Sequence, residues 1–140
     1  MNIDALIAFY ETLTPADVAR FPEFYAKEAY FKDPFNEVSG IVFIQKIFRH
    51  MFEQVGVPQF VVDEKIVDAN GAMLVWRFHF RIGPRYCKAL TLRGVSHLKF
   101  DADGKVNYHR DYWDAAEELY MKLPGLGLLM RGLQKAVSSG

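Results

Sequence analysis

Three residues with chemically useful side chains alternate near the end of the chain: His109, Asp111 and Trp113. In a β-strand, residues two positions apart point to the same face, about two rises of 3.3 Å from each other. A purely structural strand would fill such a face with valine or leucine. We therefore interpret the three as pocket residues, with His109 and Asp111 available for proton transfer. A satisfied structural histidine and an aspartate paired with Arg110 or Lys99 are the ordinary alternatives.

Asp33 is a further candidate because it precedes Pro34 at the end of an expected strand. An aspartate before a proline often does no more than form a turn, which is the structural alternative. Inside an apolar pocket, however, the carboxylate loses hydration and becomes a candidate general base. The side chains expected to line such a pocket are Phe31 or Phe35, Phe48, Met51 and Trp113.

A metal site is a further alternative, since His109, Asp111 and Asp33 could supply an imidazole and two carboxylates. The sequence has no His-x-x-x-His or Glu-x-x-His spacing on an expected helix, and Cys87 is the only cysteine. We expect no metal and no other cofactor, with Cys87 as a small buried residue.

The elements that must position these residues follow from the apolar spacing. Intervals of three and four predict helices at residues 3–13 and 41–55, and residues 21–26 are expected to be helical as well. Asn70-Gly71 and Asp103-Gly104 predict tight hairpin turns. Strands are expected at residues 29–33, 60–67, 72–82, 86–100 and 105–113, followed by a helix from Asp114. Helices followed by consecutive strands indicate an α+β fold.

The amino-acid composition indicates the broad class of protein. The chain has 140 residues, 51% hydrophobic and 24% charged, which suits one soluble domain. Lysine plus arginine and aspartate plus glutamate number 17 each, so we expect no nucleic-acid partner. No apolar run is long enough for a membrane span, and we expect a cytoplasmic protein. Residues 1–122 are expected to form the domain, with an amphipathic segment at 123–140 packed on it.

Large aromatic residues alternate with basic ones at residues 76–81. We interpret Trp76, Phe78 and Phe80 as core or dimer-face residues, and expect a homodimer through an open sheet face that these residues form with Leu92 or Val95. His79 and His97 would lie on the opposite face, outside the site.

Several strings resemble the ketosteroid isomerase and SnoaL-like branch of the nuclear transport factor 2 superfamily. They are residues 25–29 (YAKEA), 32–35 (KDPF), 100–106 (FDADGKV) and 112–113 (YW), with Gly40 at the start of the long helix. The similarity extends over residues 5–114. It implies a cone-shaped α+β fold in which a curved antiparallel sheet wraps around the N-terminal helices.

The resemblance also implies roles. Asp33 falls on the general base of the isomerases and Tyr10 on the tyrosine that donates to the substrate oxygen. Ser96 falls where the isomerases have a protonated aspartic acid, and it can donate only a neutral hydrogen bond. Trp113 would line the cavity. We expect the pocket to be shaped by Tyr25, Phe48, Ser96 and Trp113.

The function expected from this resemblance is isomerase- or cyclase-like acid–base catalysis on a small hydrophobic carbonyl compound, without a cofactor. His109 or Asp111 would help Tyr10 to stabilise the developing enolate oxygen. A non-catalytic module that binds an apolar ligand and a dimeric interaction protein are the alternatives.

Overall fold

The structure, a computed structural model, describes residues 1–118 and 135–136. Its helical elements are α1 (Ile3–Glu11), the 3-10 helix η1 (Pro15–Glu23), α2 (Ile41–Gln54), the short 3-10 helix η2 (Pro84–Tyr86) and α3 (Ala115–Glu118). The strands are β1 (Tyr25–Lys32), β2 (Glu37–Ser39), β3 (Gly56–Asp68), β4 (Gly71–Ile82), β5 (Lys88–Phe100) and β6 (Val106–Tyr112). The expected segment at residues 123–140 lies almost entirely outside the described residues.

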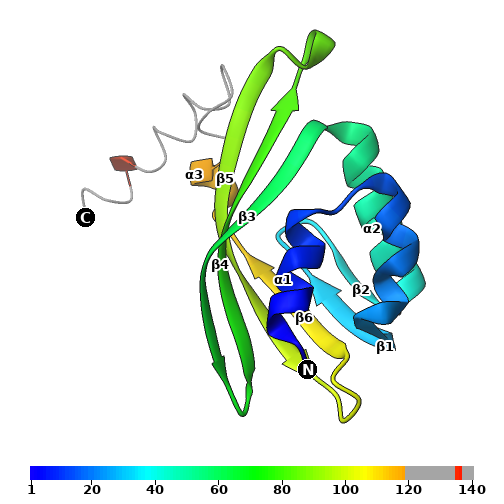
Figure 1. Cartoon of the computed structure of the whole chain (residues 1–140). Helices are drawn as coiled ribbons and strands as arrows, with labels where there is room; N and C mark the ends of the chain where they lie inside the picture. Colours follow the sequence, from blue (N-terminus) through cyan, green and yellow to red (C-terminus); the bar gives the residue numbers. More distant parts are fainter. Residues whose placement is uncertain (119–134, 137–140) are drawn as a thin grey trace.

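The six strands form one curved sheet in the order β2-β1-β6-β5-β4-β3. Helices α1 and α2 lie on one side of this sheet and α3 lies on the other (Figure 1). The expected α+β fold with a curved sheet around N-terminal helices is confirmed. The sheet is mixed rather than wholly antiparallel, because β1 pairs with β6 in the parallel direction.

Local sequence explains most element boundaries. The side chain of Asn2 accepts a hydrogen bond from the Ala5 N–H at 3.0 Å and so caps α1. Gly40 precedes α2 with a φ of 112°, a backbone conformation that favours glycine. Two expectations were wrong. Residues 21–26 are not one helix, because η1 ends at Glu23 and Tyr25 already begins β1. Cys87 is exposed rather than buried, because it directly follows η2 in the connection between β4 and β5.

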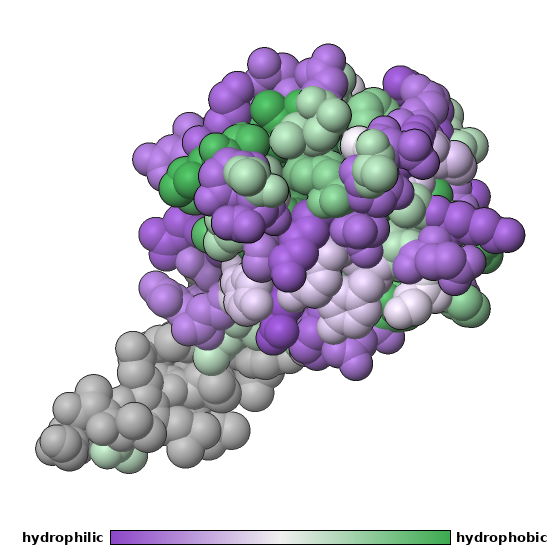
Figure 2. All heavy atoms as spheres, turned by 90° about the horizontal axis from the view of Figure 1, so that it is seen from below, coloured by the Kyte–Doolittle hydropathy of each residue, from purple (hydrophilic) through white to green (hydrophobic). Residues whose placement is uncertain are grey.

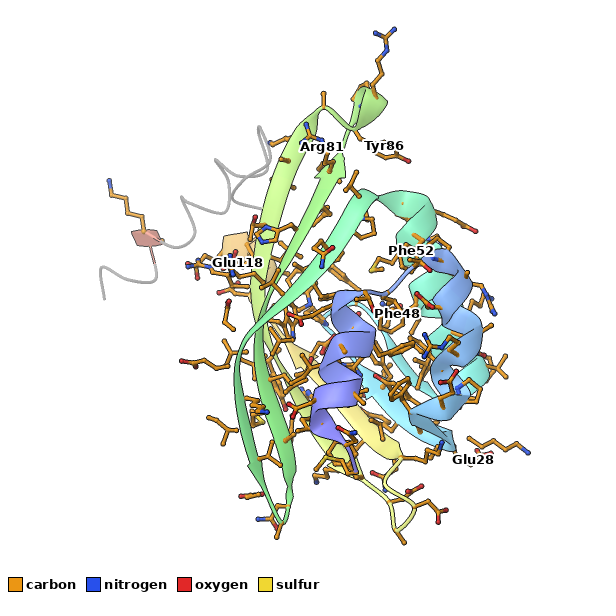
Figure 3. The ribbon with its side chains drawn as sticks, viewed as in Figure 1. Glu28, Phe48, Phe52, Arg81, Tyr86 and Glu118 are labelled. Carbon is orange, nitrogen blue, oxygen red and sulfur yellow. The ribbon has the colours of Figure 1, made fainter. Side chains whose placement is uncertain are left out.

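The core fills the space between the helices and the concave face of the sheet. Phe48 and Phe52 point from α2 toward the sheet (Figure 3). Trp76, Phe78, Phe80 and Leu92 are buried and belong to this core. The open apolar sheet face expected from them is therefore wrong, because their strand turns them inward; the homodimer itself stays a prediction.

The opposite face of the sheet is polar. Arg77 pairs with Asp63 at 2.8 Å, and Arg93 pairs with the buried Glu118 of α3 at 2.8 Å. His79 lies within 2.8 Å of the Thr91 hydroxyl and His97 packs edge-on against Tyr108, so neither histidine belongs to the concave side. Figure 2 shows a largely hydrophilic surface with an apolar area in its upper part.

Candidate active site

A pocket opens between α2 and the concave face of the sheet, with a volume of about 740 Å³. Its apolar wall includes Phe31, Phe48, Phe60, Trp76, Phe78 and Leu92. Asp33, Lys46, His50, Glu53 and Asp111 add charged or titratable groups to the lining. A concave, mainly apolar pocket of this size with a few polar groups is typical of a small-molecule site.

Asp111 is the acidic group that the sheet contributes to this pocket. Its side chain is 17% exposed, and it lies on β6 directly opposite Ser96 of β5. Oδ1 accepts a hydrogen bond from the Ser96 hydroxyl at 2.5 Å and lies 2.7 Å from His109 Nε2. Two neighbours thus fix one oxygen of the carboxylate.

The second oxygen of Asp111, Oδ2, makes no hydrogen bond to any described residue. No buried side-chain oxygen or nitrogen in the described part of the chain lacks a partner. Oδ2 therefore reaches accessible space, and Asp111 is part of the pocket wall. A carboxylate with one anchored and one accessible oxygen is well suited to accept a proton from a bound molecule.

A continuous line of hydrogen bonds runs through the core to Asp111. The Tyr10 and Tyr25 hydroxyls are 2.6 Å apart, and the Tyr25 hydroxyl lies 2.7 Å from His109 Nδ1. On the other side of Asp111, the indole N–H of Trp76 donates to Ser96 Oγ at 2.8 Å. Six side chains from α1, β1, β4, β5 and β6 are joined in this way.

The carboxylate sets the direction of these bonds. Asp111 Oδ1 can only accept, so His109 Nε2 must carry the hydrogen. With His109 as the neutral imidazole, Nδ1 then accepts from the Tyr25 hydroxyl, which in turn accepts from Tyr10. Ser96 donates to Asp111 and accepts from Trp76. In this tautomer of His109, every donor along the line is turned toward Asp111.

Burial keeps the two tyrosines in their neutral form. It is the largest cause that raises the pKa of the Tyr10 phenol, and the charge of Asp111 adds to it. Burial also raises the pKa of Tyr25 well above its ordinary value, with further contributions from Tyr10 and Asp111. Both hydroxyls remain donors across the physiological pH range.

Asp33 lies in the same pocket in a different environment. Oδ1 accepts hydrogen bonds from the backbone N–H groups of Phe35 at 2.8 Å and Asn36 at 2.6 Å. The Asn36 side-chain amide donates to both carboxylate oxygens, at 3.1 and 3.2 Å. This is the turn-forming arrangement of an aspartate before proline. Asp33 thus shapes the loop after β1 while it also lines the pocket.

The other expected site residues divide into three groups. Phe48, Met51 and Trp113 line the pocket. Tyr10 and Ser96 border a small inner chamber, and Tyr25 lies behind them in the core. Phe35 is 56% exposed and packs edge-on against Trp113, so it is not part of the pocket wall.

Two structural features were not foreseen. Trp76 takes part in the hydrogen-bonded line, and its ring lies against Gly94, the residue paired with it on β5. The alternation of Trp76, Phe78 and Phe80 shows that they share a face, but it does not show which face. His109, Asp111 and Asp33 do not form a metal site, because no group of three His, Cys, Asp or Glu side chains suited to an ion occurs in residues 1–118 and 135–136.

With this geometry in place, comparison with known proteins decides the family. A profile described as a SnoaL-like domain matches residues 6–109. The chain belongs to the SnoaL-like family. Among curated proteins none matches the sequence. No helix in the described part of this family member is long and apolar enough to cross a membrane.

Solved structures share the fold of this SnoaL-like chain at low sequence identity. A hypothetical protein with a ketosteroid isomerase-like fold from Catenulispora acidiphila, in complex with trimethylamine, is 12% identical over 84% of this chain and 88% of its own, with a TM-score of 0.70. A protein described as a SnoaL-like polyketide cyclase from a Jannaschia species is 15% identical over 82% and 86%, with a TM-score of 0.69. An epoxide hydrolase from M. tuberculosis is 18% identical over 94% and 91%, with a TM-score of 0.70. At these identities the similarity concerns the fold alone.

Proposed function

We propose that this chain is a cofactor-independent acid–base enzyme of the isomerase or cyclase type, acting on a small, largely apolar carbonyl compound. The observation that carries the proposal is the Asp111 carboxylate, with Oδ1 held by Ser96 and His109 and Oδ2 accessible in an apolar pocket. The similarity in fold to polyketide cyclase and ketosteroid isomerase-like proteins supports it.

In the proposed reaction, Asp111 Oδ2 takes a proton from the carbon next to the substrate carbonyl. The electron pair of the broken C–H bond moves toward the carbonyl oxygen and gives an enolate. In a β,γ-unsaturated carbonyl compound this enolate is a dienolate, and Asp111 returns the proton to its γ-carbon, so that the double bond moves to the α,β position. In a cyclase-type reaction the enolate carbon instead forms a bond to a second carbonyl carbon of the same molecule, whose oxygen takes up the proton.

The enolate oxygen needs a donor, and the hydroxyl of Tyr10 is already committed to Tyr25. Two other pocket-lining side chains carry a donor for this role: the ammonium of Lys46 and the indole N–H of Trp113. Neither makes a hydrogen bond or ion pair with the described residues. A donor at the developing negative charge is usually the largest contribution to catalysis in such a site.

The alternative is a module that holds an apolar ligand without turning it over, and catalysis of proton exchange separates the two. The test is exchange of the α-hydrogens of 2-decalone, a bicyclic ketone, for deuterium in heavy water, followed by mass spectrometry. We expect the protein to accelerate exchange, Asp111→Asn to lower the rate about a hundredfold or more, and Asp33→Asn to retain it within several-fold. No acceleration above buffer, or loss in Asp33→Asn alone, would overturn the assignment.

A further inference from the structure

A small chamber lies at the inner end of the pocket. It leaves about 20 Å³ for the centre of a water molecule, which is the size that one water needs. Phe48, Phe60, Trp76 and Asp111 line both the chamber and the main pocket, so the two adjoin at Asp111. The remaining wall consists of Tyr10, Val62, Leu74, Ser96 and His109.

The polar atoms of this chamber have an unusual property in common. With His109 as the neutral imidazole protonated on Nε2, the Tyr10 hydroxyl donates to Tyr25, and Ser96 donates to Asp111. Both ring nitrogens of His109 and the indole N–H of Trp76 are also engaged. Only acceptors are then left to bind a molecule in the chamber. They are lone pairs on the Tyr10 and Ser96 hydroxyls and the second carboxylate oxygen of Asp111. The chamber thus offers acceptors and no donor.

A water molecule between acceptors alone must donate both of its hydrogens. Its own lone pairs then stay unshared, and the adjoining main pocket is where a bound molecule can meet them. Donation to a carboxylate also raises the electron density on the water oxygen. The chamber therefore holds a water in the orientation of a nucleophile, next to the base that can take its proton.

We propose that the chamber binds one water molecule that adds to an α,β-unsaturated carbonyl compound in the main pocket, so that the chain is also a hydro-lyase. The proposal rests on the proposed function, since the same base and the same enolate serve both reactions. The water oxygen bonds to the β-carbon while Asp111 Oδ2 takes a water proton. The C=C electrons move to give the enolate. Asp111 then delivers that proton to the α-carbon, and the product is a β-hydroxy ketone.

The reverse reaction gives the clearest assay, because loss of water from a bicyclic β-hydroxydecalone forms a conjugated ketone that absorbs in the ultraviolet. We expect the wild-type protein to catalyse this dehydration. Val62→Ile adds one methylene to the chamber wall and should lower the dehydration rate about tenfold or more, because a one-water chamber tolerates no added volume. Deuterium exchange of 2-decalone by this variant should stay within about twofold of wild type, since Asp111 is intact.

Val61→Ile is the matched control. It makes the same substitution on the neighbouring position, which faces the other side of β3, and both rates should stay unchanged. In wild type, a water resonance with cross-relaxation to Tyr10 and His109 protons should be seen, and Val62→Ile should lose it. If the wild-type protein catalyses deuterium exchange of 2-decalone but not dehydration of the hydroxydecalone, the hydro-lyase proposal is overturned. The proposed role of Asp111 as the general base would then still hold. Absence of the bound-water signal would overturn the water site. Failure of the wild-type protein to catalyse deuterium exchange of 2-decalone would instead overturn the proposed function.

Discussion

Ser96 and Asp111 face each other across β5 and β6, and the Ser96 hydroxyl donates to Asp111 Oδ1 at 2.5 Å. The same hydroxyl accepts the Trp76 indole N–H, so one small side chain connects an aromatic wall of the pocket to its carboxylate. Ser96 is itself buried, at 5% exposure. This pairing fixes which carboxylate oxygen remains available to a substrate.

Ser96→Ala is therefore expected to act on both stability and rate. It leaves the buried Trp76 N–H without an acceptor, which should cost about 1–3 kcal/mol in the free energy of unfolding. It also frees Asp111 to rotate, and the exchange rate of 2-decalone should fall about tenfold. Urea denaturation and the exchange assay measure the two effects. Unchanged stability would show that the Trp76–Ser96–Asp111 contacts do not form.

Tyr25→Phe removes a central member of the hydrogen-bonded line that runs from Tyr10 to Asp111. The buried Nδ1 of His109 then loses its donor and the Tyr10 hydroxyl loses its acceptor, with an expected cost of about 1–3 kcal/mol. Tyr10→Phe is the comparison, since it removes only the outermost donor and should cost about 0.5–1.5 kcal/mol. Equal costs for the two variants in chemical denaturation would contradict the direction of the line.

The raised pKa values of Tyr10 and Tyr25 predict how stability depends on pH. Folding holds both phenols neutral, whereas in the unfolded chain they ionise around the ordinary value of 10.0. The contribution of these two groups is complete below that pH and is lost as the pH rises above it, because the unfolded state releases their protons first. Spectrophotometric titration of the seven tyrosines of the wild-type protein should show two that ionise only when the protein unfolds. In the Tyr25→Phe variant only one tyrosine should behave in this way. Two phenols that ionise freely in the folded protein would count against their burial.

Gly94 has a packing role that a substitution can test. A Cβ atom added there would lie 2.5 Å from the Trp76 ring. Gly94→Ala should push the indole away from β5 and break its bond to Ser96, with a loss of about 1–3 kcal/mol. Tryptophan fluorescence should shift toward that of a wetter indole. Gly104→Ala, at a hairpin turn far from the pocket, is the control that should leave the fluorescence unchanged.

Much of the fold could be predicted from local patterns. The spacing of Ile44, Phe48 and Met51 predicted α2, and the Asn70-Gly71 turn predicted the β3–β4 hairpin, both of which are confirmed. Period-two alternation also placed His109 and Asp111 together on one face. The start of β1 was mistaken because a run of aromatics at residues 21–26 suits a helix and a buried strand equally well.

The hydrogen-bonded line could not be predicted in the same way. It depends on the parallel pairing of β1 with β6 and on the register that sets Ser96 opposite Asp111, and both join residues far apart in the sequence. Alternation shows that residues share a face of a strand but not which face is inward, so the sequence leaves Trp76 as either a core or a dimer-face residue. The resemblance to the isomerases drew attention to Asp33, whereas the geometry favours Asp111.

The measurement that tests the central claim most directly is the ¹⁵N spectrum of the His109 ring in the intact protein, assigned by comparison with His109→Gln among the four histidines. If every donor is turned toward Asp111, His109 is a neutral imidazole with its proton on Nε2 and a bare Nδ1 that accepts from Tyr25. A proton on Nδ1, whether alone or together with one on Nε2, would contradict this direction and with it the account of Asp111 as the anchored base.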